Sequence, residues 1–584
     1  MPVTAVSSIV SVPSRPVAST GMSVPRLRTA DLGAQGEPYL WMLGGALALG
    51  ILMIVGFLVL VIWNGFVTFV PRGLAVVTLT DGGRVAGEVV RSETFRVPAA
   101  RLEALAPEAK ARIDAEHGFA RRTLYRTGNY DIYNDDFRWV ADFETAGIVH
   151  PEGMIFAERL EWGPFVGHVK SVTVNGEILP APDIRDENVR AAHVLSRARW
   201  QRIRKIEREE IGSVNHILER ERLALRRVMM TSGESSEAYR AASARFDSRR
   251  TETEARYKTL AEEAARLKQR DAKDRIVLAE IGGIEKDIAL SNVVRMYRAN
   301  ELTWAGKAAV YLSRWWEFLS EEPREANTEG GILPAIFGTF AMTILMVIVV
   351  APFGVVTALY LREYARQGRV VALVRISVNN LAGVPSIVYG VFGLGFFAYL
   401  VGGNIDQLFF AERLPNPTFG TGGLLWAALT LALLTVPVVI VATEEALAAV
   451  PRSMREGSLA CGASKWQTIR RIVLPRAMPG ILTGVILAMA RGAGEVAPLM
   501  LIGVVKLAPE LPIDGFFPFV HLERSFMHLG FHIFDVGFQS RNSEAGKPMV
   551  FVTTLLLIAL IAIMNFAAII LRNRLKRRFA GGHF

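Results

Sequence analysis

Long runs of apolar residues recur along the chain. Five runs contain no acidic or basic side chain, and they cover residues 38–71, 332–361, 376–405, 414–443 and 548–571. A sixth, residues 477–505, is apolar except for Arg491 and Glu495. A bilayer core about 30 Å thick takes about 20 helical residues to cross, and buried helices of soluble proteins rarely stay uncharged for so long. The pattern therefore predicts six membrane-spanning helices.

The first apolar run, residues 38–71, is longer than the hydrophobic part of a secretion signal, and no small-residue cleavage site follows it. We therefore expect it to remain as an anchor. The preceding residues 1–37 are rich in Ser, Pro and Val and contain Arg15, Arg26 and Arg28, which is typical of a disordered cytoplasmic tail.

Charge in the connecting segments predicts the orientation. Arginines concentrate in three segments that alternate crossings place on one side, residues 362–375, 444–476 and 572–578. The opposite loops, 406–413 and 506–547, mix both signs. Since Lys and Arg are retained on the cytoplasmic side, both termini are expected there, including a tail at 579–584. Residues 72–331 are then extracytoplasmic.

This insertion has two kinds of pattern. Residues 72–181 are expected to be β-rich, because residues 74–79 show strand-like alternation before Asp81-Gly82-Gly83 and because Asn175-Gly176 is a turn signal. Residues 182–304 are charged and favour helix. They predict a helical hairpin that bends at residues 231–235, followed by a linker at 305–331.

Apolar residues of the predicted hairpin fall at near-heptad spacing, at Leu260, Ala264, Leu267, Leu278, Ile281 and Ile288. Asp271 and Asp274 interrupt this coiled-coil seam, which favours a locally packed hairpin over a long dimeric coiled coil. The expected fold is thus an all-α transmembrane bundle of six helices, whose core covers residues 332–578, with an inserted extracytoplasmic α+β domain.

Composition narrows the class of protein. Hydrophobic residues make up 51% of the chain and charged residues 21%, and the mean hydropathy is +0.28, which fits separate membrane and aqueous parts. The net charge of +10 could indicate nucleic-acid binding, but the arginines lie beside apolar runs, so we expect a lipid bilayer and no nucleic acid. The single cysteine, Cys461, excludes a disulfide framework or a cysteine-based zinc cluster within one chain.

A spaced motif lies in the basic loop before the fifth span. It reads Glu456-Gly457-Ser458-Leu459-Ala460-Cys461-Gly462, then nine residues, then Ile472-Val473-Leu474-Pro475. Gly462 permits a backbone bend, and Pro475 is expected to end a second short helix before the span begins. An ordinary amphipathic loop is the alternative interpretation.

This motif resembles the EAA loop of ABC importer permeases, whose pattern is Glu-Ala-Ala, three residues, Gly, nine residues and Ile-x-Leu-Pro. Gly457 and Ser458 replace the two alanines. The resemblance implies that Glu456, Gly462, Ile472, Leu474 and Pro475 belong to a loop that docks on an ATPase.

Two charges interrupt the fifth span. A charged residue at the bilayer centre costs roughly 2.5–3.5 kcal/mol, so such residues usually face a protein interior and mark a function. Arg491 and Glu495, four residues apart, are expected to share a helix face. Arg491 would bind an oxyanion and Glu495 would orient it; alternatively, the two only neutralise each other. Gly492 and Gly494 would allow close approach to this face.

The string 487–499 around this pair, the string 381–390 in the third span, and residues 444–447 resemble the phosphate-specific Pst family of ABC importers, in the PstA type of permease more than PstC. The resemblance covers residues 332–578 and implies a type I ABC importer permease fold, with helix packing near the pathway at Gly383, Pro385, Tyr389, Gly492 and Gly494. It also implies a PstC-like second permease, a PstB-like ATPase dimer and a periplasmic phosphate-binding protein in a bacterial inner membrane. The large insertion exceeds this family's compact form.

The sequence contains no Gly-x-x-x-x-Gly-Lys-Ser/Thr phosphate loop. We therefore expect a transport subunit and not an enzyme, with no metal or cofactor of its own, and with ATP and Mg on the partner ATPase. Glycines 390, 393 and 395 lie in a span, where helix packing accounts for them better than nucleotide binding. Two alternatives stay open. The first is a permease of the same architecture for another oxyanion, such as molybdate or sulfate, or for another small solute, such as an amino acid. The second is a membrane-anchored sensor or scaffold that uses the hairpin.

Overall fold

The computed structural model describes residues 37–580 except 104, 106, 180–182, 509 and 541. Most of the predicted tails, residues 1–36 and 581–584, lie outside this range. The chain divides into a unit that ends at Leu60 and a second unit from Val61 onward. The first unit contributes the greater part of helix α1 (Glu37–Val67), an apolar helix along its whole length.

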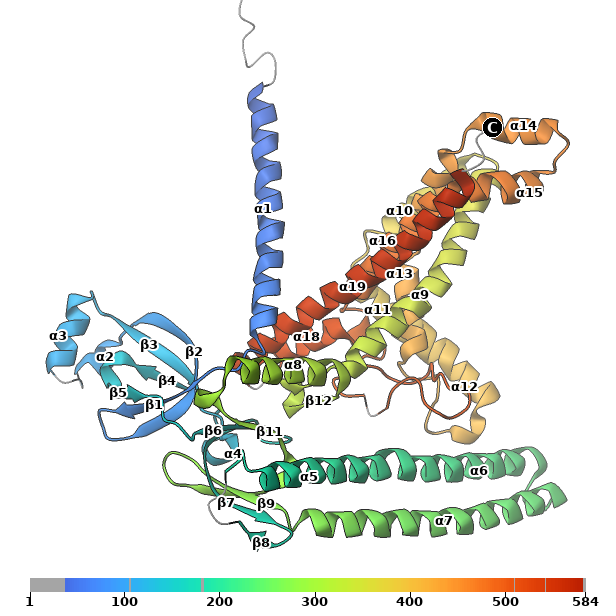
Figure 1. Cartoon of the computed structure of the whole chain (residues 1–584). Coiled ribbons are helices and arrows are strands. Elements are labelled where there is room, and N and C mark those ends of the chain that lie inside the picture. The colour runs from blue at the N-terminus through green and yellow to red at the C-terminus, as the bar shows by residue number, and fades with distance from the viewer. Residues whose placement is uncertain are drawn as a thin grey trace, which may run out of the picture. The chain divides into compact units, whose positions relative to one another are not determined.

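Six helical segments are long and apolar enough to span a membrane, as the sequence predicts: Tyr39–Val67, Leu333–Tyr364, Ser386–Phe409, Leu424–Ala448, Lys465–Gly494 and Ser543–Arg577. After α1, their main helices are α9 (Leu333–Leu359), α11 (Ser386–Phe392) with the π-helical η7 (Gly393–Gly402) and α12 (Gly403–Phe409), α13 (Leu424–Ala448), α16 (Leu474–Gly494) and α19 (Ser543–Ala580) (Figure 1).

Helix α13 is the centre of the bundle. It packs against both α9 and α16, and it is the most buried of the six segments. Glycines allow these close contacts: a Cβ on Gly354 of α9 would lie 2.6 Å from Val439 Cγ1, and one on Gly484 of α16 would lie 2.4 Å from Ala442 Cβ. Small residues at helix crossings let backbones approach where lipid provides no hydrophobic drive.

The third span differs from its predicted bounds of 376–405. Helix α10 (Arg369–Leu381) ends before Pro385, and α11 begins after it. Proline has no N–H to donate and disfavours helix at the preceding residue, so the chain breaks there. The spanning segment therefore shifts to Ser386–Phe409 and includes Asp406, which the sequence places in a loop. The Asp406 carboxylate is buried and accepts N–H bonds from the loop residues Thr418, Phe419 and Gly420.

Two antiparallel sheets form the β part of the insertion. The first has the order β4-β3-β2-β1-β5, with β1 (Leu74–Leu79), β2 (Arg84–Arg96), β3 (Phe119–Arg126), β4 (Phe137–Ala141) and β5 (Thr145–Val149). The second has the order β10-β9-β7-β6-β11, with β6 (Ile155–Arg159), β7 (Phe165–Val174), β9 (Arg275–Ala279), β10 (Glu285–Ala289) and β11 (Val293–Arg298). Strand β8 (Glu177–Ile178) pairs with β7 through the predicted turn, where Asn175 and Gly176 both have positive φ.

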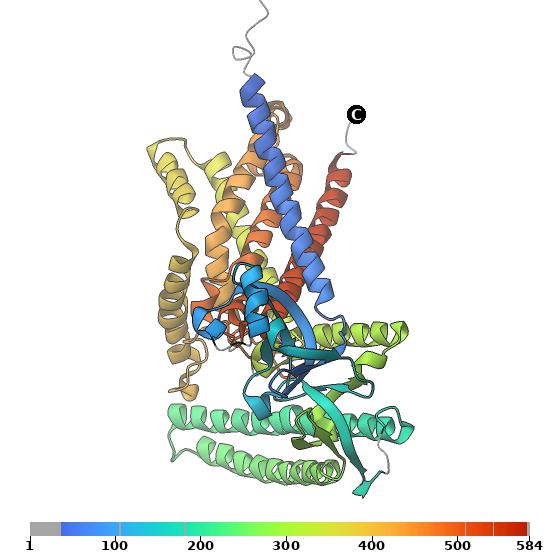
Figure 2. The same ribbon diagram turned by 90° about the vertical axis from the view of Figure 1, so that its left-hand side faces the viewer.

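The helical hairpin is an excursion from the second sheet. It consists of α5 (Glu187–Lys205), the π-turn η2 (Ile206–Glu210) and α6 (Ile211–Ser232), then α7 (Glu237–Asp271), which runs back beside α6 (Figures 1 and 2). The bend follows Ser232, as predicted. Short helices α2 (Ala99–Glu103), α3 (Pro107–Ala115) and α4 (Tyr130–Tyr133) complete the insertion before it.

The predicted hairpin limit of residue 304 is wrong. Helix α7 ends at Asp271, and residues 275–298 form strands that pair with β6 and β7. Leu278 and Ile288 therefore lie in β9 and β10, outside any heptad seam, and Ile281 lies in the turn between them. The misleading spacing arose because a β-branched strand segment followed an amphipathic helix without a strong break. Asp274 is buried at the hairpin base, where it pairs with Arg199 and accepts the Asn175 N–H at 2.7 Å.

The predicted linker 305–331 is also structured. It contains α8 (Trp304–Ser320) and the small ribbon β12 (Pro323–Arg324) and β13 (Glu329–Gly330). On α8, Arg314 and Glu317 bond into the insertion, whereas Trp304, Leu312 and Trp316 are exposed. This two-faced pattern is typical of an amphipathic helix.

Candidate functional site

Arg491 lies in the last turn of α16, the helix that ends at Gly494. Its Nε lies 3.7 Å from Glu495 Oε1, which is an ion-pair distance and too long for a hydrogen bond. Within the described part of the chain, Glu495 is the only ionic partner of Arg491, and the guanidinium donates no hydrogen bond. The side chains are 35% and 22% exposed, so this guanidinium can be reached by a ligand.

The expectation that both charges share a helix face is wrong in one respect. Glu495 follows the helix end and has extended backbone geometry, with φ −78° and ψ 135°. The chain turns there because Pro498 comes three residues later and cannot continue the helix. The two side chains meet across a helix terminus and not along a helix.

The turn after Glu495 packs against the third span. Helix α11 contacts α17 (Leu499–Ile502), and a Cβ on Gly390 would lie 2.7 Å from the Cα of Pro498. A Cβ on Gly393 would lie 2.6 Å from Ile502 Cδ1. The structure thus brings together the two sequence strings, 381–390 and 487–499, that lie about a hundred residues apart.

The other predicted packing residues divide into two groups. A Cβ on Gly492 would lie 2.4 Å from Met346 Sδ of α9. Tyr389 is buried, and its hydroxyl donates to the Leu381 carbonyl at 2.5 Å. Pro385 is the residue directly before α11. In contrast, a Cβ on Gly494 or Gly395 would meet no atom within 4 Å, and one on Gly383 only its local carbonyl at 3.4 Å. No other element of the described chain packs closely against Gly383 or Gly494, so their predicted role in helix packing stays a prediction.

The spaced loop motif forms one short helix, a turn at Gly462 and the beginning of a longer helical segment. Helix α14 (Arg452–Ala460) leads to Gly462, whose φ is +82°, and α15 (Lys465–Thr468) follows with a capping box between Ser464 and Gln467. Ser458 and Thr468 bond through their hydroxyls at 2.9 Å. Glu456 is exposed on α14, and Ile472, Leu474 and Pro475 are half-buried on the following helix.

Pro475 does not end the second helix as predicted. Helix α15, the π-turn η9 (Ile469–Val473) and α16 form one continuous segment from Lys465 to Gly494. Pro475 occupies the first turn of α16, directly after the π-turn, where a missing N–H is tolerated.

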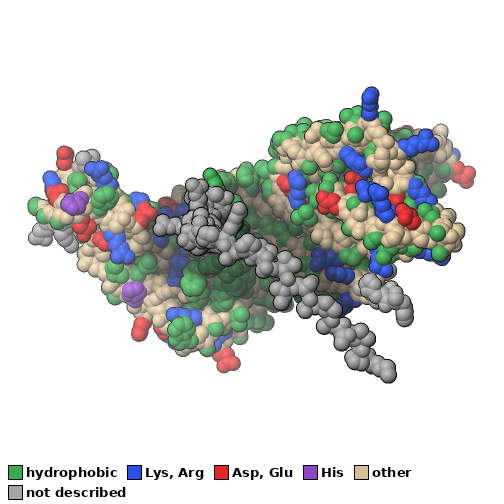
Figure 3. Space-filling model, turned by 90° about the horizontal axis from the view of Figure 1, so that it is seen from above, with side chains coloured by type: hydrophobic (Ala, Val, Ile, Leu, Met, Phe, Trp, Pro, Cys, Tyr) green, Lys and Arg blue, Asp and Glu red, His purple; other side chains and the backbone are tan. Residues whose placement is uncertain are grey.

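Arg455 anchors α14, and sequence reasoning missed this residue. It donates to the carbonyls of Val450 and Leu447 at 2.6 and 2.7 Å and to Glu363 at 2.9 Å. The sequence did not distinguish Arg455, one residue before Glu456, because the loop contains many other arginines. A groove of about 380 Å³ lies between α14 and the start of α16, lined by residues that include Met454, Gly457, Arg471 and Ile472. Figure 3 shows basic side chains gathered at this end of the bundle.

The chain is similar in sequence to known transport proteins. The family model described as "Binding-protein-dependent transport system inner membrane component" matches residues 350–579. The chain is 35% identical over 274 residues to "Phosphate transport system permease protein PstA 1" of Mycobacterium tuberculosis (strain CDC 1551 / Oshkosh), which is 47% of this chain and 81% of that protein.

A second relative is "Probable ABC transporter permease protein YqgH" of Bacillus subtilis (strain 168), with 37% identity over 203 residues. That alignment covers 34% of this chain and 62% of the relative. Among solved structures, an inward-facing form of the MetNI methionine ABC transporter aligns over 42% of this chain and 95% of its own, with 20% identity and a TM-score of 0.31.

Proposed function

Because the chain belongs to the binding-protein-dependent transport permeases, as a permease of the PstA type, we propose that it carries inorganic phosphate into the cytoplasm. It is a multi-pass membrane protein of an ABC importer. In the proposal, both termini are cytoplasmic, residues 72–331 are extracytoplasmic, and Arg491 is a contact for the transported anion.

The observation that carries the phosphate assignment is the loose pairing of Arg491. Its ion pair with Glu495 is long, and its remaining donors have no acceptor within the described residues. A guanidinium fork matches the oxygens of a phosphate in a bidentate arrangement. A nearby carboxylate repels a bound anion, which favours release from a site that must not hold its substrate tightly.

The continuity of one helix supports the proposed coupling to an ATPase. Residues 465–494 join the proposed docking loop to Arg491 as a single helical segment of 30 residues, about 45 Å long. In the proposal, a docked ATPase that displaces α15 would also displace Arg491, because both belong to this helical segment. The groove between α14 and α16 would receive part of that ATPase.

The partners in this proposal are a PstC-like second permease, a PstB-like ATPase dimer that binds ATP and Mg, and a periplasmic phosphate-binding protein. The match to binding-protein-dependent transport permeases supports an ATPase and a substrate-binding protein as partners, and the relatives named as phosphate transport permeases support phosphate as the substrate. This chain would contribute one half of the pathway and the docking loop for one ATPase subunit.

ATP-dependent uptake of labelled phosphate into vesicles that carry the assembled complex tests the function. We expect Arg491→Ala to lower uptake by about tenfold or more, since one charge-assisted contact is worth roughly 1.5–3 kcal/mol. Arg574→Ala, which removes an equal charge at an exposed position on α19, is the matched control. Excess sulfate and molybdate should compete poorly. Uptake that follows another anion, or that survives the loss of Arg491, would refute the substrate or the site while leaving the architecture intact.

A further inference from the structure

A second charged site lies away from the transport pathway, in a cavity of about 350 Å³ beside α8. Its walls come from the end of α1 beyond residue 63, strands β2 and β3, helix α8, the ribbon β12–β13 and the start of α19. The insertion, the first span and the last span therefore meet here. Cavities of this size suit small ligands or the head of a larger one.

Basic side chains outnumber carboxylates in its lining by six to five. The basic residues are Arg72, Arg91, Arg126, Arg314, Arg324 and Lys547. Arg72 donates only to the carbonyls of Val89 and Val90, at 2.9 and 3.1 Å, and forms no ion pair among the described residues. Arg126 pairs with Glu329 at 2.5 Å, yet its Nε is buried without an acceptor.

One carboxyl group in the lining has no partner. Glu88 is 8% exposed, and its Oε1 has no hydrogen-bond partner in the described structure. Burial raises the pKa of Glu88 and also that of Glu317. In its protonated form, the Glu88 carboxyl does not repel an oxyanion, and its hydroxyl can donate to one.

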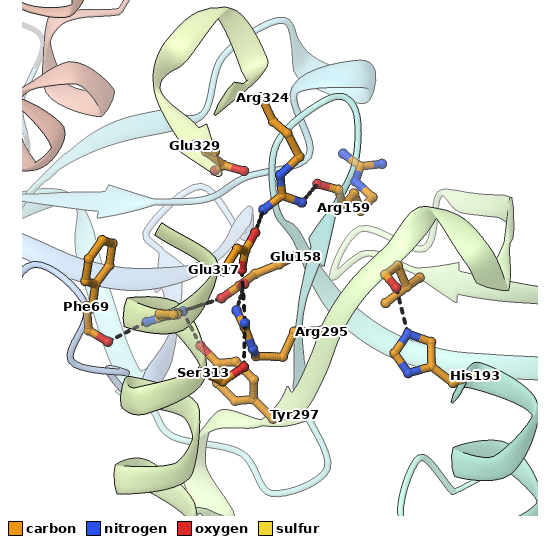
Figure 4. A network of polar contacts seen from close by, with 12 residues as sticks. Phe69, Glu158, Arg159, His193, Arg295, Tyr297, Ser313, Glu317, Arg324 and Glu329 are labelled. Atoms are coloured by element: carbon orange, nitrogen blue, oxygen red, sulfur yellow. Dashed lines mark hydrogen bonds and ion pairs between the residues drawn. The ribbon is translucent and has the colours of Figure 1, made fainter. Parts of the chain in front are cut away.

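The neighbouring carboxylates are already occupied. Glu158 pairs with Arg314 at 2.6 Å and also with Arg295, and Glu317 bonds Arg324 and Arg295, as Figure 4 shows. Arg314 further donates to the Phe69 carbonyl at 3.1 Å, which ties α8 to the end of the first span. This network holds the cavity wall in place and leaves Arg72, Arg126 and Glu88 with unused bonding capacity.

Part of the lining is apolar and comes from the ends of the spanning helices and the residues just beyond them, namely Val67, Phe69, Val70, Pro548, Met549 and Phe551. The outer face of α8 exposes Trp304 and Trp316, and tryptophan favours the headgroup level of a bilayer. Both features place the cavity where phospholipid headgroups lie.

We propose that this cavity binds the phosphate group of an anionic ligand, on Arg72, Arg126 and Glu88, and thereby fastens the insertion to the first and last spans. Guanidinium groups recognise phosphate oxygens, and a wall that is half charged and half apolar suits a phosphodiester that carries hydrocarbon. The same chemistry would accept free inorganic phosphate, so the source of the phosphate is decided by experiment.

Binding to the assembled membrane complex, without the periplasmic binding protein, in phosphatidylcholine nanodiscs tests this proposal in two arms. Native mass spectrometry measures retained phosphatidylglycerol in one arm. Equilibrium binding of labelled inorganic phosphate is measured in the other, in an Arg491→Ala background that removes the proposed pathway contact. The variants are Arg126→Gln and Val90→Trp, which fills the cavity without a change of charge. Arg122→Gln is the control, because Arg122 lies on the same strand and pairs with Glu93 at 2.5 Å outside the cavity.

We expect one probe to bind, with affinity reduced about tenfold or more in Arg126→Gln and Val90→Trp and unchanged in Arg122→Gln. Retained phosphatidylglycerol identifies a lipid, and phosphate binding without lipid identifies the free anion. The proposal is overturned if neither probe binds, or if binding is equal in all variants. If Arg126→Gln fails to fold, Val90→Trp alone decides, since it leaves every ion pair in place.

Discussion

Asp136 illustrates how the insertion tolerates a buried charge. It lies before β4, and its backbone carbonyl accepts the N–H groups of Thr127 and Gly128. Its Oδ1 is buried without a hydrogen-bond partner in the described structure. Burial raises the pKa of Asp136 from 3.8 to about 6, against the opposing effect of Arg126. The residue therefore weakens the insertion when it is ionised.

Replacing Asp136 by Asn should remove a dependence of stability on pH. The folded pKa lies above the unfolded one, so the folded insertion holds this proton longer, and stability falls as pH rises from 3.8 to about 6. The free energy of unfolding of Asp136→Asn, relative to that of the wild type, should therefore rise between pH 3.8 and about 6 and stay constant at higher pH. Hydrogen exchange of the β3 and β4 amides as a function of pH measures the difference.

Asp135→Asn, one residue earlier and exposed, controls for the change in net charge. A difference between Asp136→Asn and wild type that is flat from pH 4 to 7 would show that the unpartnered oxygen carries no penalty.

At the scale of elements, the turn between α14 and α15 rests on one glycine. The φ of Gly462 is +82°, and a Cβ there would meet no atom within 4 Å, so its requirement is conformational and not steric. A left-handed conformation costs a residue with a side chain roughly 1–2 kcal/mol. Gly457, in the same loop, is helical and equally open.

Gly462→Val should therefore distort the loop, whereas Gly457→Ala should leave it intact or strengthen α14. In membranes, we expect Gly462→Val to reduce ATPase retention severalfold and Gly457→Ala to retain it fully; sedimentation with the membrane fraction measures both. Equal retention in the two variants would argue against docking through this turn.

Packing between α11 and the turn after Glu495 can be tested with a pair of glycines in one span. Gly390 faces the backbone of Pro498, and Gly395 faces open space. Gly390→Ala should destabilise the chain by about 1–3 kcal/mol, because backbone atoms cannot rotate away. Gly395→Ala should have little effect. The unfolding temperatures of the two variants in detergent measure the difference. If Gly390→Ala leaves the unfolding temperature unchanged, the packing between the strings 381–390 and 487–499 contributes little stability.

At the scale of the whole molecule, the insertion contacts the core at several points besides α8. Arg227 of α6 pairs with Glu412, and the ring of His216 stacks on Phe516 with centroids 4.3 Å apart. Asn327 donates to Asp535 at 2.9 Å. Glu412 lies in the short helix η8 (Ala411–Arg413), and Asp535 lies in α18 (Leu529–Phe538), which packs against α9. Arg455 of α14 pairs instead with Glu363 in η6 (Tyr360–Tyr364), which follows the carboxyl-terminal end of α9. Helix α9 is about 40 Å long over its 27 residues.

A complete importer needs two permease halves, and we expect this chain to pair with one copy of a PstC-like permease. The measured mass of the purified complex, with each permease tagged differently, should give one copy of each per two ATPase subunits. An active complex with two copies of this chain and no second permease would contradict the expectation.

Local pattern was sufficient for much of the fold. The six spans could be predicted because crossing a bilayer requires a long apolar helix, which is a property of consecutive residues. Strand β1, the Asn175-Gly176 turn and the hairpin bend at Ser232 were likewise predicted, since each depends on neighbouring side chains or on glycine and asparagine at positive φ. The spacing of the loop from Glu456 to Pro475 was visible for the same reason.

Other features depended on residues far apart in the chain. Strands β9 and β11 pair with β7 and β6, which precede the helical hairpin in the chain, and β10 pairs with β9. The local hydrophobic pattern cannot predict pairing between strands so far apart in the sequence. Glu495 lies outside α16 because the chain turns at the end of that helix. Pro475 lies within the helical segment because the π-turn directly before it accommodates the proline. The sequence by itself therefore determined the membrane architecture and the family, whereas tertiary structure alone decided which charges meet, because electrostatic contact follows distance in space and not along the chain.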